Sequence, residues 1–434
     1  MGRPFKFVFA FQPGPGHWSR LGAIAARLRE RGHHVVIATS EAFRRRLDSS
    51  SYDDFWAIGP SWEEDRLEAG DFPPPRGMVE ELKSRSGAIA SFFFGAAAQV
   101  AADLTRALQQ GSRPDLIVFD YTLLGGPPAA EALGLPWATV FGLTVPFSNP
   151  GWPPFGSHLG LARSPAIRRE YELIERSIIR ENRQLYRPLG DLWRAAGRRL
   201  QDPWRAYARL GRLGIVGSIP ACEFPLPQKF PPQIHYVGPL LGREHDSTGL
   251  DEEAAAFVRP SADPLIHLTL GMTFSRAGAI LQRLIRALGD EPLRLLISSG
   301  HLDPRWVQDG CGGGAAPLLV RPTVPHLQVI PRVAALICHG GSGTLMKALY
   351  FGAPVLVIPL GAEQRSNGAR LVHAGIGKMI LPARLSPPGI RNAVRGLLDP
   401  ARGYLKRARE MGELARRAGG AQFAATLLEK VCEP

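Results

Sequence analysis

The chain has 434 residues, which at about 150 residues per domain predicts two or three domains. With 45% hydrophobic and 21% charged residues, it has the composition of a globular protein, which excludes disordered, collagenous and coiled-coil chains. The net charge of +13 is typical of a protein with an anionic partner such as a nucleotide, a nucleic acid or a lipid surface. The arginines form no dense tract and no aromatic array lies between them, which argues against nucleic acid.

The four cysteines are far apart in the sequence, and none is in a CxxC pair, so a disulfide scaffold or a zinc site is not expected. The first apolar run is too short for a signal peptide, and the longest, Gly87–Ala102, is too short to span a membrane. We therefore expect a cytoplasmic protein that contacts a membrane at most peripherally.

The first forty residues predict a βαβ unit. A buried strand at Phe5–Phe11 is followed by a Pro/Gly loop at Gln12–Gly16, a helix at Trp18–Arg31 and a second strand at His34–Thr39. This order implies parallel strands, with the loop at the carboxyl end of the first strand. Further strands are predicted at Asp115–Phe119 and Trp137–Phe141, with a helix from Ala129 between them, and residues 160–215 are predicted to be helical.

A proline-rich segment at 220–245 predicts a domain boundary, and the α/β rhythm restarts after it. Strands are predicted at Leu265–Leu270, Leu293–Ser298, Leu318–Val320, Ala335–Cys338 and Val355–Pro359, with helices at Ala277–Leu288, Gly343–Tyr350 and Ser366–His373. The expected domains are a Rossmann-like domain at 1–220, a linker at 221–245, a second Rossmann-like domain at 246–405, and a C-terminal helix at 406–434 that packs back on the first domain. The fold class is α/β, and ligands are expected in the cleft between the two parallel sheets.

The segment His339–Arg370, HGGSGTLMKALYFGAPVLVIPLGAEQRSNGAR, holds the densest group of candidate binding residues. His339 follows a predicted strand, the glycines allow a tight turn, and the backbone N–H groups of the helix that begins there favour an anion such as phosphate. Beyond the next strand, Glu363 and Gln364 could hydrogen-bond a polyol. A glycine-rich turn alone would be weak evidence for phosphate binding, whereas two such loops at one sheet edge are much stronger.

This segment resembles the donor-binding signature of the GT-B glycosyltransferases of the UDP-glycosyltransferase superfamily, roughly HGGxGTxxEALxxGxPxlxxPxxxDQxxNA. The matching residues are His339, Gly340, Gly341, Gly343, Thr344, Ala348, Leu349, Gly352, Pro354, Pro359, Gln364 and Asn367. The resemblance extends to Gly16-His17, Pro114-Asp115 through Asp120, Tyr236–Pro239 and Leu270-Gly271. It implies the GT-B fold, two Rossmann-like domains facing each other across a cleft, and a monomer or weak homodimer.

The resemblance also implies roles for single residues in an inverting sugar transfer to a small lipophilic acceptor. His17 would be the general base and Asp120 would orient it. On the donor side, His339 and the turn Gly341, Ser342, Gly343 and Thr344 would bind the diphosphate, Gly271 and Thr273 would add contacts to the distal phosphate, and Glu363 and Gln364 would hold the sugar. No metal or other cofactor is implied, because the donor is a UDP- or dTDP-linked sugar and the sequence has no DxD motif.

Several departures from the family pattern lie in the donor half. Lys347 stands where a carboxylate usually accepts hydrogen bonds from the ribose, and lysine has no acceptor. Thr323-Val324-Pro325-His326 lacks the tryptophan that stacks on the base, so Val324 and His326 are the candidates at this position, and Met272 replaces a hydroxyl residue. In the first loop, Ser19-Arg20 stands where Asn-Pro is common. A deoxyribose donor would be less affected by the missing carboxylate.

Aromatic residues indicate a lipophilic acceptor site, with Phe92, Phe141 and Trp152 as the candidates, although ordinary core packing would account for about half of such residues. Three alternatives remain open from the sequence. A MurG-like transferase acting on a membrane-held lipid fits the positive charge. A non-catalytic auxiliary protein that keeps the fold fits Lys347, Thr323 and Met272. A Rossmann oxidoreductase is weaker, because Gly14-x-Gly16 lacks the third glycine.

Overall fold

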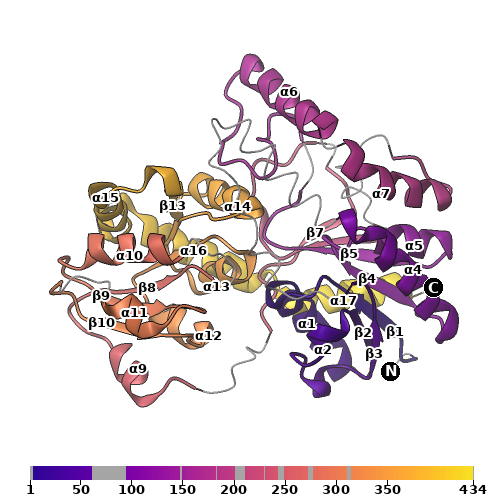
Figure 1. Ribbon diagram of the computed structural model, residues 1–434, viewed down its shortest axis with the longest axis horizontal. Helices are drawn as coiled ribbons and strands as arrows, with labels where there is room; N and C mark the ends of the chain where they lie inside the picture. Colours follow the sequence, from indigo (N-terminus) through magenta and orange to yellow (C-terminus); the bar gives the residue numbers. More distant parts are fainter. Residues whose placement is uncertain are drawn as a thin grey trace. The chain divides into compact units, whose positions relative to one another are not determined.

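The computed structural model describes residues 3–60, 94–146, 149–181, 183–200, 211–228, 230–242, 249–271, 277–309 and 314–433. The chain divides into two compact units (Figure 1). Unit 1 comprises Met1–Pro220, Pro225–Arg243 and Ala418–Pro434, and unit 2 comprises Ala221–Phe224 and Glu244–Arg417. Each unit is built on one parallel β-sheet.

The sheet of unit 1 has seven parallel strands in the order β3-β2-β1-β4-β5-β6-β7. The central strands are almost continuously apolar, as is typical of strands that are covered on both faces. The strands are β1 (Lys6–Ala10), β2 (His34–Thr39), β3 (Asp54–Ala57), β4 (Leu116–Asp120), β5 (Trp137–Phe141), β6 (Leu213–Val216) and β7 (Ile234–Tyr236). Strand order reverses between β1 and β4, so the carboxyl ends of these two strands flank the point where open α/β sheets bind ligands.

Two groups of helices pack on this sheet (Figure 1). In the first, α17 contacts α1, β4 and β6; in the second, α4, α5 and α7 contact one another. The helices of unit 1 are α1 (Pro15–Glu30), α2 (Glu41–Arg44), α4 (Ala97–Gln110), α5 (Gly126–Ala132), α6 (Pro165–Glu181), α7 (Arg183–Ala195) and α17 (Gly420–Cys432). The last helix belongs to unit 1 although the preceding 170 or so residues belong mainly to unit 2.

The sheet of unit 2 has six parallel strands in the order β10-β9-β8-β11-β12-β13. The strands are β8 (Leu265–Thr269), β9 (Arg294–Ser298), β10 (Leu318–Arg321), β11 (Ala335–Cys338), β12 (Val355–Val357) and β13 (Gly377–Met379). The helices are α9 (Glu252–Phe257), α10 (Ala277–Leu288), α11 (Pro304–Asp309), α12 (His326–Val329), α13 (Ser342–Phe351), α14 (Ala362–His373), α15 (Pro387–Leu398) and α16 (Tyr404–Arg417). Order reverses here between β8 and β11, and His339 follows β11 directly.

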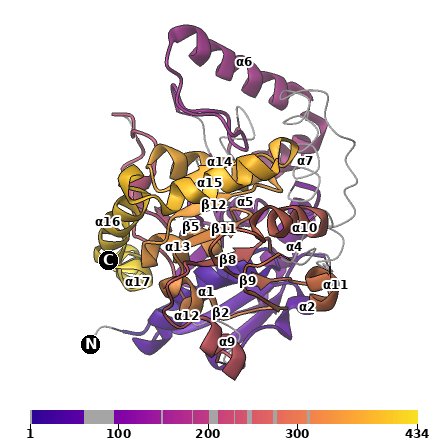
Figure 2. The ribbon, with the colours of Figure 1, turned by 90° about the vertical axis from the view of Figure 1, so that its left-hand side faces the viewer.

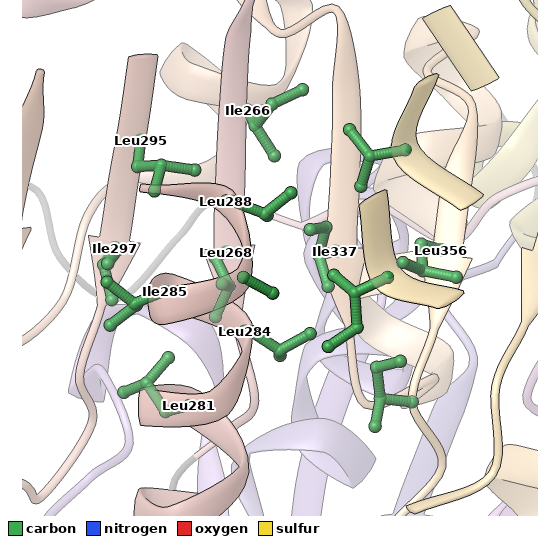
Figure 3. Close-up of a cluster of buried hydrophobic side chains, with 14 of the residues drawn as sticks. Ile266, Leu268, Leu281, Leu284, Ile285, Leu288, Leu295, Ile297, Ile337 and Leu356 are labelled. Atoms are coloured by element: carbon green, nitrogen blue, oxygen red, sulfur yellow. The ribbon is translucent and has the colours of Figure 1, made fainter. Parts of the chain in front are cut away.

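The core of unit 2 lies between the sheet and the pair α10 and α15, which contact each other (Figure 2). Helix α10 places apolar residues three and four positions apart, so that one stripe faces the strands. Figure 3 shows this stripe, Leu281, Leu284, Ile285 and Leu288, against side chains from β8, β9, β11 and β12. Burying four such side chains contributes about 6–12 kcal/mol of transfer free energy, which fixes the strands that carry the candidate donor loops.

The short segment Ala221–Phe224 joins unit 2 through α14. Glu223 and Arg370 are both buried and form an ion pair, and the guanidinium carbon of Arg370 lies 4.7 Å from the ring centroid of Phe224. A buried charge is costly unless it is paired, so these contacts account for the placement of two ionised side chains in an apolar setting.

Three sequence-based boundaries differ from the structure. Helix α1 begins at Pro15, not Trp18, because proline at the first helical position has its φ angle fixed near the helical value. The C-terminal segment 406–434 contains α16 and α17 where one helix was expected, because Gly419 and Gly420 both have positive φ and end the first helix. The segment 221–245 contains the short strand β7. Within the described residues, no helix has the length and apolar character needed to cross a membrane.

Candidate active site

His17 lies in the first turn of α1, where the sequence predicted the end of a loop. Its Nδ1 atom is 3.1 Å from Oδ1 of Asp120, the last residue of β4, so the structure brings together the two predicted catalytic residues. Strands β1 and β4 are paired in register, Ala10 opposite Phe119, and this register brings the start of α1 beside the end of β4. The His17 side chain is 25% exposed and that of Asp120 is fully buried, so the base is accessible and its partner is not.

Asp120 is held as an anion by several donors. Burial alone would raise the pKa of its carboxyl, but Arg20, His17 and the Thr122 hydroxyl together hold that pKa well below its usual range. Oδ1 accepts hydrogen bonds from the backbone N–H of Thr122 at 3.0 Å and from the Thr122 hydroxyl. The carboxylate therefore accepts hydrogen bonds within its own turn, and its anionic form suits the orientation of a histidine. Asp115, the alternative partner, accepts from the backbone N–H of Lys6 at 2.8 Å at the start of the strand.

His339 lies in unit 2, directly after β11, with its ring against two glycines. A Cβ atom on Gly271 would lie 3.0 Å from Cε1 of His339, and one on Gly341 would clash with its Nε2. Gly271 also has a φ of +78°, which L side chains rarely adopt. Burial lowers the pKa of His339 to about 4, against the raising effects of Glu363 and of a backbone hydrogen bond with Thr269. The ring is therefore neutral near pH 7, and its buried Nδ1 has no hydrogen-bond partner among the described residues.

The turn that follows His339 leads into α13, whose first turn holds no acidic residue. Gly341 precedes the helix, and Ser342, Gly343 and Thr344 begin it, so their N–H groups lie at its positive end. The Ser342 hydroxyl donates to Oε1 of Glu363 at 3.2 Å, and Asn367 Nδ2 donates to the carbonyl of Gly340 at 2.9 Å. These bonds join the loops after β11 and β12, so the structure brings the diphosphate and sugar candidates together.

The remaining donor-side candidates have different surroundings. Oε1 of Gln364 accepts from the backbone N–H groups of Leu360 and Gly361 at 2.7 and 2.8 Å, so only its amide nitrogen remains for a sugar. Burial, followed by the charges of His267, Lys347 and His339, lowers the pKa of His326 well below its ordinary value, which places Lys347 in the same cluster. Val324 is a buried apolar residue of the core beside α9. Thr273 and Met272 lie outside the described residues.

The aromatic acceptor candidates are either buried or outside the described residues. Phe92 lies outside the described residues. Phe141 and Trp152 are both buried; the Phe141 ring lies 5.8 Å from that of Tyr121, and Trp152 Nε1 donates to the carbonyl of Pro225 at 3.1 Å. In the part of the chain that the structure describes, no group of three or more His, Cys, Asp or Glu side chains is arranged to hold a metal ion.

Sequence reasoning gave no site role to Arg20, Thr122 and Asn367. Arg20 is buried beside His17 and Asp120, and Asn367 is fully buried between the two donor loops. Asn367 could have been identified from the sequence, because it belongs to the matched signature. Arg20 appeared only as a departure from a common Asn-Pro pair, and nothing in the sequence around Thr122 pointed to a contact with the base.

The chain is similar to known proteins over almost its whole length. Residues 309–418 match the family described as erythromycin biosynthesis protein CIII-like, C-terminal domain. The chain is 28% identical to 4'-demethylrebeccamycin synthase of Lentzea aerocolonigenes, over 95% of this chain and 96% of that protein. It is 24% identical to the NDP-glycosyltransferase YjiC of Bacillus subtilis strain 168, over 96% and 95%. The crystal structure of the glycosyltransferase VinC in complex with dTDP superposes with a TM-score of 0.67 and 18% sequence identity, over 98% of this chain and 99% of that one. This structural likeness confirms the fold predicted from the sequence.

Proposed function

Because the chain belongs to the GT1 family of glycosyltransferases, enzymes with the GT-B fold, we propose that it moves a sugar from a nucleoside diphosphate to a hydroxyl of a small lipophilic molecule, with inversion at the anomeric carbon. The observation that carries this proposal is the contact between Nδ1 of His17 and Oδ1 of Asp120 at 3.1 Å, with the His17 ring partly exposed. A buried carboxylate that holds one nitrogen of an accessible imidazole leaves the other nitrogen as a base.

In this mechanism Nε2 of His17 takes the proton of the acceptor hydroxyl. The acceptor oxygen then bonds to the anomeric carbon as the bond from that carbon to the diphosphate oxygen breaks, and the nucleoside diphosphate leaves. Asp120 stabilises the imidazolium that forms. The N-terminus of α13 and His339 stabilise the charge that develops on the leaving diphosphate. Glu363 accepts hydrogen bonds from the sugar hydroxyls, and the amide nitrogen of Gln364 donates to them.

The acceptor class rests on similarity to relatives whose names refer to natural products, rebeccamycin and erythromycin, and the zeaxanthin glucosyltransferase of Pantoea ananas adds a carotenoid. We propose an acceptor of this polycyclic or polyene kind. We do not assign aromatic contacts with this acceptor to Phe141 or Trp152, because both side chains are buried and pack within unit 1.

For the donor, we propose a dTDP-linked sugar. Lys347 on α13 has no acceptor to offer the ribose hydroxyls, and dTDP lacks the 2'-hydroxyl that a carboxylate would hold. The dTDP complex of the similar glycosyltransferase VinC supports the same nucleotide. Lys347 also adds a positive charge near His326, which favours an anionic ligand.

Calorimetric titration with dTDP and with UDP tests this assignment. We expect dTDP to bind at least as tightly as UDP to the natural chain. Lys347→Glu supplies a charged acceptor and should tighten UDP binding by about tenfold, since a hydrogen bond to a charged group contributes about 1.5–3 kcal/mol. Lys406→Glu, the same charge change on the exposed face of α16, is the matched control and should alter neither.

A clear preference of the natural chain for UDP would contradict the dTDP assignment and leave the transferase intact. Failure of the folded chain to bind either nucleotide, alone or with a lipophilic acceptor present, would contradict the transferase itself. That second result would favour a non-catalytic auxiliary role.

A further inference from the structure

Arg20 is a charged residue next to the proposed base that the mechanism above does not use. It lies on α1 three residues after His17, and only 3% of its surface is exposed. Its Nη1 donates to the carbonyl of Gly16 at 3.1 Å, and its Nη2 pairs with Oδ2 of Asp120. Its guanidinium carbon lies 5.5 Å from the ring centroid of Tyr121. A guanidinium in this setting is fixed in place and fully charged.

The two oxygens of Asp120 are divided between two partners. Oδ1 faces Nδ1 of His17 at 3.1 Å, and Oδ2 accepts from Arg20. The Nη2 atom of Arg20 is also 2.9 Å from Nδ1 of His17. An imidazolium and a guanidinium would therefore compete for one buried carboxylate. In a simple histidine–aspartate pair the imidazolium has the carboxylate to itself.

We propose that Arg20 is a positioning residue that shares Asp120 with His17, holds the His17 ring with its free nitrogen outward and opposes a positive charge on the ring. This inference rests on the proposed function, in which His17 is the base. The Asp120 carboxylate is a stronger hydrogen-bond acceptor than Nδ1 of His17, because hydrogen bonds to a charged oxygen are about twice as strong as neutral ones. Nδ1 therefore keeps its proton and donates it to Asp120. The positive charge of Arg20 opposes a second positive charge on the ring.

Two charged side chains of the described residues contact the His17 ring. The charged side chains that contact it, in the ranges the structure describes, are Asp120 from β4 and Arg20 from the same helix; the Thr122 hydroxyl, 3.5 Å from Nδ1, is neutral. Removing Arg20 leaves an uncompensated carboxylate beside the ring. The protonated ring then becomes easier to form, and protonation begins at a higher pH.

Nitrogen-15 NMR of histidine-labelled protein measures this directly, with no substrate present. The His17 signal is assigned by its loss in His17→Ala, and the ring is titrated from pH 4 to pH 9. In Arg20→Met the midpoint should rise by about one pH unit or more, which is the usual effect of one neighbouring charge. Arg20→Lys keeps the charge and should stay near the natural value. Arg27→Met, an exposed position on the same helix, is the matched control and should not move the midpoint.

An unchanged midpoint in folded Arg20→Met would overturn the proposal. So would a neutral ring in the natural protein with its proton on Nε2, because that tautomer accepts from Arg20 and cannot act as the base. If Arg20→Met does not fold, the tautomer of the natural protein and the Arg20→Lys titration decide the matter. The proposed function fails separately, through full activity of His17→Ala, so the two failures are distinguishable.

Discussion

His17→Ala is expected to lower the transfer rate by about 10³-fold and to leave nucleotide affinity unchanged. A positioned general base contributes about 10²–10⁴-fold to such a reaction, and Nε2 is the only nitrogen of the ring that Asp120 and Arg20 leave available. The donor residues belong to unit 2, so a substitution in unit 1 should leave the calorimetric titration with dTDP as it was. The measurement is kcat for sugar transfer together with that titration.

His34→Ala is the control for this substitution. His34 begins β2 with about half of its side chain exposed, at the opposite end of the sheet from the carboxyl ends of the strands. It should retain the natural rate. A rate in His17→Ala within tenfold of the natural value would show that another group takes the proton.

In unit 2, His339→Ala is expected to lower kcat by about 10²-fold and to weaken binding of the diphosphate. The neutral His339 ring has a buried Nδ1 without a partner among the described residues, and it lies at the turn that leads into α13. Removing one preorganised donor from a site where negative charge develops costs about 10²–10³-fold in rate. Rates with a dTDP-sugar and titrations with dTDP and thymidine separate the two effects, because thymidine lacks the diphosphate and should bind as before.

His373→Ala serves as the control within unit 2, since His373 is an exposed residue in the last turn of α14. It should change neither quantity. If His339→Ala lost affinity for thymidine and for dTDP in the same proportion, His339 would support the fold of the pocket and would not bind the diphosphate.

Much of each sheet could be predicted from the sequence, because buried parallel strands are apolar along their whole length. His34–Thr39, Trp137–Phe141 and Ala335–Cys338 have the predicted limits. The edge strands β3, β7 and β13 were missed, since three or four residues with polar members, such as Asp54–Ala57, carry no clear period. The interior strand β6 was also missed, and the prediction of helix over residues 160–215 was wrong at its end, because four apolar residues are too few to separate a strand from a helix by pattern. Strand order depends on pairing between distant segments, which the local pattern does not encode.

The candidate site could likewise be predicted only in part from the sequence. The pairing of His17 with Asp120 and the joining of the loops around His339 and Glu363 follow the family signature, and the contacts agree with it. Arg20 could not be placed, because whether its side chain reaches Asp120 depends on the register between β1 and β4. Gln364 was expected to hold the sugar, yet its carbonyl oxygen caps its own helix, a local backbone need that the motif does not reveal.

The most direct test of the proposed reaction is the anomeric configuration of the product. The protein is incubated with α-linked dTDP-sugars and a panel of polyketide, polycyclic aromatic and carotenoid acceptors, and any glycosylated product is identified by mass and by proton NMR. Direct attack by an acceptor oxygen that His17 deprotonates predicts a β-linked product, formed by the natural protein and lost in His17→Ala. An α-linked product would contradict single-step displacement, and the absence of transfer to every acceptor by a chain that binds dTDP would contradict the acceptor class.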